Sequence, residues 1–189
     1  MTMIIALAGP KGVGKNHFFN EAKSIFNRFA WKQIAFADPI KNNIIDIFNL
    51  TNENDYDIFK RSSISVNNNN IEGRDIVRKI GMLMRSYDEN QFVNYVKNKI
   101  ESDSNNSACP PCWVITDLRF HNEYELIKNQ LHGKIIKIKN NNIQYDFHVS
   151  ELEFDDNLCD FVFDVTNLSE KEYKRKLLTL LTKLLCSYF

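Results

Sequence analysis

The chain has 189 residues, of which 43% are hydrophobic, and this composition predicts one folded domain with a substantial core. Its 24 lysine and arginine residues balance 24 aspartate and glutamate residues, so the formal net charge is zero. Such a balance provides no general electric field that would attract nucleic acid or an anionic membrane, and we expect neither as a partner.

Strand-like and helical patterns alternate along the chain. A short apolar run typical of a buried parallel strand occurs at 3–8, and further strands are predicted at 31–37, 112–117, 134–139, where the pattern alternates, and 160–165. Apolar residues at three- and four-residue spacing indicate helices over 15–29, 38–48, 71–87, 89–100, 122–131 and 169–189. This alternation predicts an α/β fold of three layers, in which helices flank a five-stranded parallel sheet.

Two of the predicted helices begin with recognisable capping residues. Asp38 and Pro39 are expected as the N-cap and the first residue of the second helix. Ser169 and Glu172 have the spacing of a capping box at the start of the last helix. After the second predicted helix, the polar residues 51–70 predict a flexible connector with at most one helical turn.

The sequence GPKGVGK at residues 9–15, called the glycine loop below, fits the pattern G-x-x-x-x-G-K. Glycines allow successive backbone N–H groups to turn around phosphate oxygens, and the helix that follows points its positive end at them. A lysine at the position of Lys15 reaches the β and γ phosphates. A tight turn that uses glycine only for its conformation is the structural alternative. The residues expected to bind ATP are Gly9, Lys11, Gly12, Val13, Gly14, Lys15, Asn16 and His17.

The hydroxyl residue that normally follows this lysine is absent. Serine or threonine at that position ligates Mg²⁺, whereas this chain has Asn16 and then His17. The amide oxygen of Asn16 can ligate Mg²⁺ or hold one of its waters, because Mg²⁺ keeps several waters in such sites. The alternative is a degenerate loop that binds nucleotide weakly.

Asp117 ends the third predicted strand and Arg119 lies two residues later, at the edge of the sheet where α/β proteins bind ligands. Asp117 is a candidate Mg²⁺ ligand, and its alternative role is the N-cap of the next helix. Arg119 can form a forked pair of hydrogen bonds with phosphate oxygens and clamp the charge of the transferring group. Together with Lys15, these two residues are the predicted catalytic residues.

Further cations and carboxylates lie on the helices between the second and third strands. Arg74 and Arg78 share one face of their helix, and Arg85 lies close to that face, so the three can grip an acceptor phosphate. An ordinary solvated helix face explains the same residues. Asp38 and Lys41 are candidate acceptor-binding residues, with capping and surface exposure as their alternatives.

Five segments in a fixed order resemble a known family. They are the glycine loop, AFADPIK (35–41), GRDIVRKIG (73–81), VITDLRFHNE (114–123) and FHVSE (147–151). The ordered set resembles the P-loop deoxynucleoside monophosphate kinases of large DNA phages and viruses, and it is also similar to animal-type phosphomevalonate kinase. The resemblance implies one nucleoside-monophosphate-kinase-like domain over 1–189, with a helical acceptor-binding insert over about 38–101 and a lid over about 140–158. It also implies that Glu151 contacts the substrate.

The expected activity is transfer of a phosphoryl group from ATP, with Mg²⁺, to a deoxynucleoside monophosphate. Transfer to another phosphate monoester, as in phosphomevalonate kinase, is one alternative. A catalytically weak nucleotide-binding protein is the other, because Asn16 is unusual and residues 120–174 contain no arginine. The expected partners are small nucleotides, and the chain is expected to be a monomer or homodimer.

The four cysteines indicate the compartment. Four thiols without the spacing of a disulfide scaffold are typical of a reduced, cytoplasmic chain, which would be the host cytoplasm if the protein is viral. Cys109 and Cys112 match C-x-x-C, but zinc would need a second such pair, so we interpret the match as coincidence.

Overall fold

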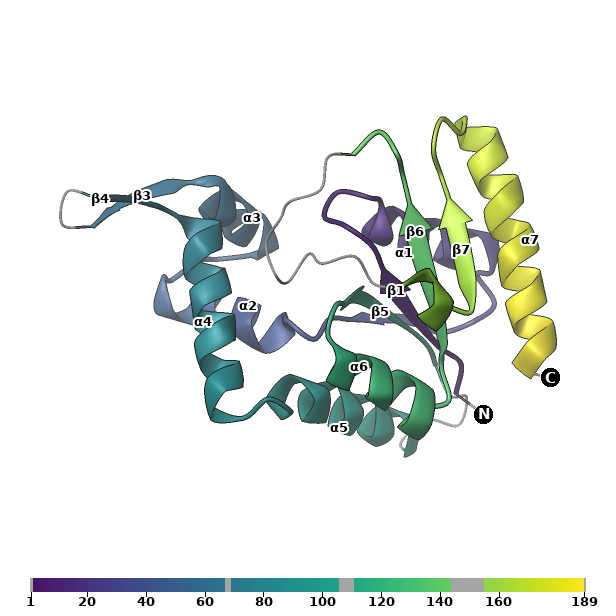
Figure 1. Ribbon diagram of the computed structural model, residues 1–189, viewed down its shortest axis with the longest axis horizontal. Helices are drawn as coiled ribbons and strands as arrows, with labels where there is room; N and C mark the ends of the chain where they lie inside the picture. Colours follow the sequence, from purple (N-terminus) through teal and green to yellow (C-terminus); the bar gives the residue numbers. More distant parts are fainter. Residues whose placement is uncertain (1, 67–68, 106–110, 144–154, 189) are drawn as a thin grey trace. The chain divides into compact units, whose positions relative to one another are not determined.

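The structure is a computed structural model that describes residues 2–66, 69–105, 111–143 and 155–188 (Figure 1). The chain forms two compact units. Met1–Ala35 and Val96–Phe189 make up the first, called the sheet unit, and Phe36–Tyr95 make up the second, called the helical unit. Each unit is described by itself below.

The sheet unit contains a five-stranded parallel sheet in the order β2-β5-β1-β6-β7. Its strands are β1 (Ile4–Ala8), β2 (Trp31–Ile34), β5 (Cys112–Leu118), β6 (Lys134–Lys139) and β7 (Phe161–Asp164). All five predicted strands are confirmed, although β2 ends at Ile34 rather than at residue 37. The central strands β1, β5 and β6 are almost completely buried, which is why β1 reads as a continuous apolar run, whereas β6 buries Lys137, whose ammonium forms an ion pair with Asp156.

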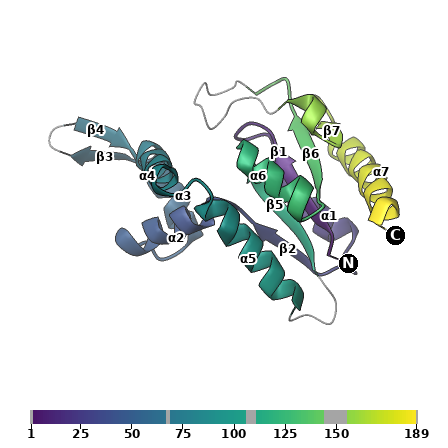
Figure 2. The same cartoon turned by 60° about the horizontal axis from the view of Figure 1, so that its bottom comes forward.

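Helices cover both faces of this sheet (Figures 1 and 2). The helices of the unit are α1 (Lys15–Ile25), α6 (His121–Glu125) with the π-helix η1 (Leu126–Gln130), the short 3₁₀ helix η3 (Asp156–Leu158), α7 (Glu170–Tyr188) and, from Val96 onward, α5 (Gln91–Asn105). On one face, Phe18 of α1 and Leu177 and Leu181 of α7 pack into the main core. The three-layer α/β fold is therefore confirmed.

The helical unit contains α2 (Asp38–Ile47), α3 (Glu53–Arg61), β3 (Ser63–Val66), β4 (Asn69–Glu72) and α4 (Gly73–Tyr87). The prediction of a connector at residues 51–70 is wrong, because α3 and the antiparallel β3–β4 hairpin occupy this range. Asn52 caps α3 by accepting hydrogen bonds from the N–H groups of Asn54 and Asp55. The side chains of Tyr56 and Phe59 in this helix are buried. The polar composition thus reflects solvated faces.

The helix boundaries differ from the expectations in two places. Asp38 is the first residue of α2 and not its N-cap, which is Ala37, and no side chain of the described residues caps this helix. The helix predicted at 71–87 begins only at Gly73, because residues 71 and 72 pair in β4. The capping box of α7 is confirmed: the Ser169 N–H donates to the Glu172 carboxylate at 2.9 Å.

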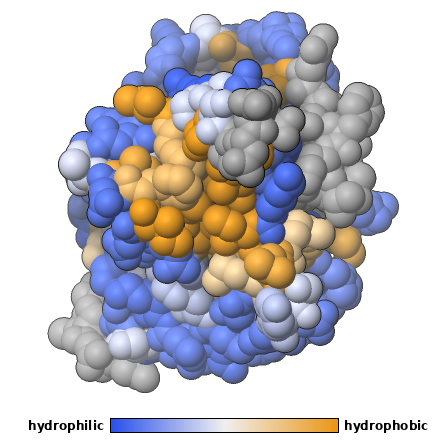
Figure 3. Space-filling view, turned by 90° about the vertical axis from the view of Figure 1, so that its left-hand side faces the viewer, coloured by the Kyte–Doolittle hydropathy of each residue, from blue (hydrophilic) through white to orange (hydrophobic). Residues whose placement is uncertain are grey.

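The helical unit exposes a group of large apolar side chains. These are Ile47, Phe48, Ile58, Met82, Leu83 and Tyr87, with exposed fractions from 40% to 86%. Figure 3 shows apolar surface gathered on one face of the molecule. With about sixty residues, the helical unit is too small to bury all the apolar side chains of its helices.

Candidate active site

The glycine loop joins β1 to α1, as the motif predicts, and its glycines adopt conformations that other residues rarely reach. Their φ angles are +133° at Gly9, +80° at Gly12 and +102° at Gly14. A Cβ atom at Gly9 would also lie 2.5 Å from the carbonyl oxygen of Ile138 on β6. Gly9 is therefore required both for its backbone angle and for the close approach of the loop to the sheet.

The Lys15 side chain bends back toward this loop, where its ammonium forms hydrogen bonds. Its Nζ donates hydrogen bonds to the carbonyl oxygens of Gly9 at 2.7 Å and Pro10 at 2.8 Å. The first turn of α1, residues 15–18, contains no acidic side chain, and no side chain of the described residues caps the helix at Gly14. The positive end of α1 and the lysine thus occur together at one loop, an arrangement that binds phosphate.

The His17 side chain faces α7. Its ring centroid lies 4.7 Å from that of Tyr173, and its Nε2 lies 3.9 Å from a carboxylate oxygen of Glu170. Its predicted contribution to ATP binding then depends on its backbone N–H in the first turn of α1. The ammonium nitrogen of Lys174 lies 3.4 Å from a carboxylate oxygen of Glu21 and 3.1 Å from one of Glu170. Lys174 therefore supplies the positive charge next to these two carboxylates.

The Asn16 side chain is held by a residue that the sequence analysis did not identify. Gln33 of β2 donates from its amide nitrogen to the Oδ1 of Asn16 at 3.0 Å. The same nitrogen lies 3.4 Å from the hydroxyl oxygen of Thr116 on β5. Thr116 is one of few buried polar residues, at 7% exposure, and it directly precedes Asp117. No signal in the sequence indicated this contact, because Gln33 stands beside Lys32 in the polar middle of the short strand β2.

The β5 strand contains an irregularity where Thr116 and Asp117 lie. Along the pairing with β1, Ala6 lies opposite Ile115, but Ala8 lies opposite Leu118, so β5 has one extra residue here. Such bulges change the direction of side chains and are frequent beside active sites. The N-cap of α6 is Phe120, so the alternative role of Asp117 as a helix cap is excluded.

Glu123 fixes the backbone at Arg119. Its carboxylate, only 1% exposed, accepts hydrogen bonds from the N–H groups of Arg119 at 2.9 Å and Phe120 at 3.2 Å. The turn after β5 therefore has a defined conformation, and Arg119 is placed at the carboxyl end of this central strand. The structure thus brings the loop, Asn16, Asp117 and Arg119 to neighbouring strand ends of the sheet unit.

The predicted acceptor-binding residues lie in the helical unit, apart from Glu151, which is outside the described residues. Arg74, Arg78 and Arg85 all belong to α4. The Arg78 guanidinium lies 3.7 Å from the Asp75 carboxylate, and the Arg85 guanidinium lies 4.7 Å from the ring centroid of Phe92. On α2, Lys41 forms an ion pair with Glu53 of the N-terminal turn of α3. Burial, together with the negative charge of Asp38, raises the pKa of Tyr95, so Asp38 lies near that hydroxyl.

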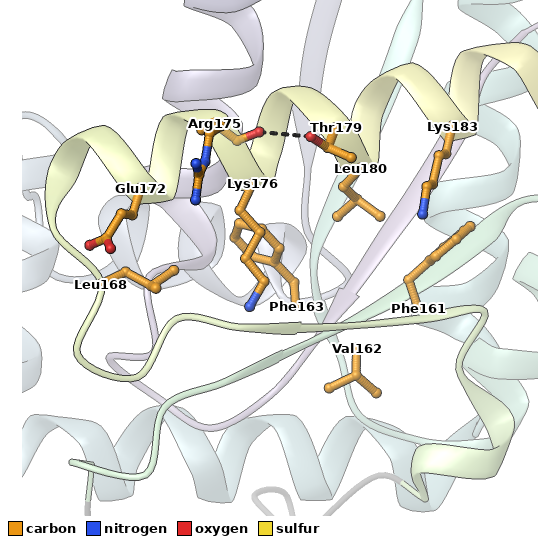
Figure 4. A pocket seen from close by; sticks show the side chains of 10 residues that line it. All are labelled: Phe161, Val162, Phe163, Leu168, Glu172, Arg175, Lys176, Thr179, Leu180 and Lys183. Atoms are coloured by element: carbon orange, nitrogen blue, oxygen red, sulfur yellow. Dashed lines mark hydrogen bonds between the residues drawn. The ribbon is translucent and has the colours of Figure 1, made fainter.

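A hollow of about 460 Å³ lies between β7 and α7 (Figure 4). Phe161, Phe163 and Leu180 supply apolar lining, and Arg175, Lys176 and Lys183 supply cations. Because β7 is an edge strand, two positions from β1 in the sheet, the hollow is separate from the glycine loop. None of the residues that line it is a predicted site residue.

The strand order, with the glycine loop between the central strand β1 and α1, gives the chain a P-loop NTPase fold. Dephospho-CoA kinase from Campylobacter jejuni has a similar fold, with a TM-score of 0.54 and 18% sequence identity over the full length of both chains. No protein-family model matches the chain.

A sequence relative identifies the family. The chain is 30% identical over 161 residues to a protein of Acanthamoeba polyphaga mimivirus described as a putative deoxynucleotide monophosphate kinase, and the match covers 80% of this chain and 81% of the viral one. The chain belongs to the family of that kinase, and it is a phosphotransferase. The viral source of the relative agrees with the type of family expected from the motifs.

Proposed function

We propose that this kinase transfers the γ-phosphoryl group of ATP to a deoxynucleoside monophosphate and forms the diphosphate. The observation that carries the proposal is the glycine loop, in which Lys15 is bonded to two loop carbonyls beside the uncapped start of α1. The family relation supports the choice of acceptor, since the mimivirus relative is described as acting on deoxynucleotide monophosphates.

ATP would lie with its phosphates against the glycine loop and Lys15. The residues suited to Mg²⁺ are Asn16 and Asp117, because amide and carboxylate oxygens are the hard ligands that this ion prefers. When bound, Mg²⁺ would neutralise charge on the β and γ phosphates. Arg119 would bind the transferring group, and its backbone is already fixed by Glu123.

The acceptor would be held by the helical unit. Arg74, Arg78 and Arg85 of α4 provide the positive charge for its phosphate, and Asp38 and Lys41 of α2 provide further polar contacts. We assign Glu151 the same substrate-binding role. No protein base is required, because the acceptor is an ionised phosphate, so catalysis consists of positioning and charge neutralisation.

The domain division belongs to the same proposal. We propose that residues 38–101 serve as the acceptor-binding insert and 140–158 as a lid that excludes water from a single kinase domain. We propose small nucleotides as the partners, with no nucleic acid or membrane, in a cytoplasmic monomer or homodimer. Across the described residues, no helix is both long and apolar enough to cross a bilayer.

A panel of acceptors tests the function. The protein is incubated with ATP, Mg²⁺ and each deoxynucleoside monophosphate, and separately with mevalonate 5-phosphate or dephospho-CoA, while ADP formation is followed. We expect ADP only with one or more of the deoxynucleotides. ADP formation only with mevalonate 5-phosphate or dephospho-CoA would replace the proposed acceptor, and nucleotide binding without any ADP would make the chain a catalytically inactive binding protein.

A further inference from the structure

The unusual Asn16 is part of a short chain of polar side chains that crosses from α1 to the sheet. The Gln33 amide nitrogen is 3.0 Å from the Asn16 Oδ1 and 3.4 Å from the Thr116 Oγ1. Gln33 pairs with Val114 in the β2–β5 ladder, so Thr116, two residues further along β5, shares its face of the sheet. The three side chains therefore come from three elements that meet beside the glycine loop.

This contact determines which end of the Asn16 amide is held. An asparagine amide has an acceptor oxygen and a donor nitrogen of nearly the same shape, so its orientation is decided by its neighbours. The Gln33 nitrogen faces two oxygens, one on Asn16 and one on Thr116. In this orientation the Gln33 nitrogen donates one proton to each of them, and it is the Asn16 oxygen, not its nitrogen, that faces Gln33.

The held oxygen retains capacity for a metal. A carbonyl oxygen has two lone pairs, and the bond from Gln33 uses one of them. The Asp117 carboxylate follows Thr116 at the bulge in β5 and supplies a second hard oxygen at the same end of the sheet. Neutral and anionic oxygen donors of this kind fit Mg²⁺ rather than a softer metal.

We propose that Gln33 is a positioning residue for the metal side of the glycine loop. It fixes the Asn16 carbonyl oxygen so that this oxygen replaces the missing loop hydroxyl, as a ligand of nucleotide-bound Mg²⁺ or of one of its waters. Thr116 anchors Gln33 by accepting its second proton. The inference depends on the proposed function in one respect, which is that the glycine loop binds ATP together with Mg²⁺.

Residues that orient metal ligands affect metal affinity even though they do not touch the metal. Their removal typically lowers metal affinity by about tenfold to a hundredfold. Serine at position 16 would present its hydroxyl directly, as in most loops of this type, and would need no amide to orient it. The effect of removing Gln33 should therefore depend on which residue occupies position 16.

Calorimetry with the non-hydrolysable analogue β,γ-imido-ATP tests this without turnover. Its Kd is measured once with EDTA and once with Mg²⁺. The ratio of the two values, called the gain from Mg²⁺ below, is the factor by which the metal increases the affinity for the analogue. We expect Gln33→Leu to reduce this gain about tenfold while the Kd in EDTA stays unchanged. Gln130→Leu serves as the matched control, because Gln130 is an exposed glutamine that bonds Lys97 in α5, and the gain should remain that of the unaltered protein.

A second pair of variants decides whether Gln33 acts through Asn16. In the Asn16→Ser background, Gln33→Leu should no longer change the gain from Mg²⁺. An equal loss in both backgrounds, or no loss in either, would overturn the proposal. If the analogue fails to bind the unaltered protein under either condition, the proposed function is wrong as well, so the two failures are distinguishable.

Discussion

At the scale of single residues, Lys15 is the side chain on which the proposed chemistry depends most. Its ammonium is held by two loop carbonyls, so it is placed for phosphate before any ligand arrives. We expect Lys15→Ala to lower kcat by roughly two to three orders of magnitude, because one preorganised charge is lost where charge develops in the transition state. Steady-state kinetics with the accepted deoxynucleotide measures the effect.

The control for this substitution is a lysine of the helix that follows the loop. Lys23, in the last turn of α1, is exposed, and Lys23→Ala should reduce kcat by less than about tenfold, as expected for a solvated charge. Circular dichroism checks that both variants are folded, so that a fall in kcat reports on the lost charge and not on lost structure. Near-normal turnover of Lys15→Ala would mean that phosphoryl transfer takes place elsewhere.

Residues of this site differ in how far sequence alone can predict them. The glycine loop was predictable, because its function requires fixed spacing within seven consecutive residues, and the φ angles of Gly9, Gly12 and Gly14 agree with that requirement. Gln33 and Thr116 were not, because they meet Asn16 only after three separate elements have packed together. Contacts of this kind leave no periodic signal in a single sequence.

At the scale of elements, the start of α4 depends on a glycine for lack of space rather than for its φ angle. A Cβ at Gly73 would lie 2.0 Å from the carbonyl oxygen of Phe59, which belongs to the backbone of α3. Helix propensity alone would favour Gly73→Ala by up to about 1 kcal/mol. We expect the opposite sign, a loss of roughly 1–3 kcal/mol in unfolding free energy, because the backbone of α3 must shift.

Gly81 of the same helix provides the matched comparison. A Cβ there would lie 2.9 Å from the Cδ1 of Ile40, the end of a flexible side chain that can turn aside. Gly81→Ala should therefore cost much less than Gly73→Ala in urea unfolding followed by circular dichroism. Equal effects of the two substitutions would show that the α3–α4 contact does not limit the space at Gly73.

The capping box of α7 gives a prediction for pH. The hydrogen bond from the Ser169 hydroxyl, with a second from its N–H, holds the pKa of Glu172 below its usual value. A carboxyl whose pKa is lower in the folded state stabilises that state at neutral pH, and this contribution is lost as the pH falls through its unfolded and then its folded pKa. Glu172→Gln should therefore lower the melting temperature at pH 7, and the difference from the unaltered protein should shrink below about pH 4. A difference that does not vary with pH would contradict this origin.

The elements that sequence analysis missed share one property. The helix α3 and the β3–β4 hairpin lie in a polar stretch, where few apolar positions reveal a period. The order of α3 comes from the Asn52 cap and from two buried aromatic side chains, Tyr56 and Phe59, and a composition-based prediction weighs neither. The strands of the main sheet were predictable for the opposite reason, since β1 is buried on both faces and reads as an apolar run, and the isoleucines of β6 recur in a strand-like alternation.

At the scale of the whole molecule, the proposed binding functions are divided between the two compact units. The glycine loop, Asp117 and Arg119 belong to the sheet unit, whereas Arg74, Arg78 and Arg85 belong to the helical unit. If ATP binds to the first and the acceptor to the second, substitutions in the two units should affect different kinetic constants.

Arg78 is suited to the test because the structure offers both explanations for it. Its guanidinium lies 3.7 Å from Asp75 on the same helix, and such a pair at the surface contributes at most about 1 kcal/mol to stability. A charged hydrogen bond to an acceptor phosphate is worth about 1.5–3 kcal/mol. Arg78→Ala should therefore raise the KM for the deoxynucleotide about tenfold to a hundredfold, while the Kd of β,γ-imido-ATP remains unchanged.

Asp75→Asn separates the two roles of this arginine. It removes the negative partner and keeps the guanidinium, so the KM for the acceptor should stay close to that of the unaltered protein if phosphate binding is what Arg78 does. An increase in KM as large as that of Arg78→Ala would instead assign the arginine to the structure of α4, because both substitutions break the same pair. A change in the affinity for β,γ-imido-ATP in either variant would show that the helical unit also takes part in binding ATP, and the division of function between the units would fail.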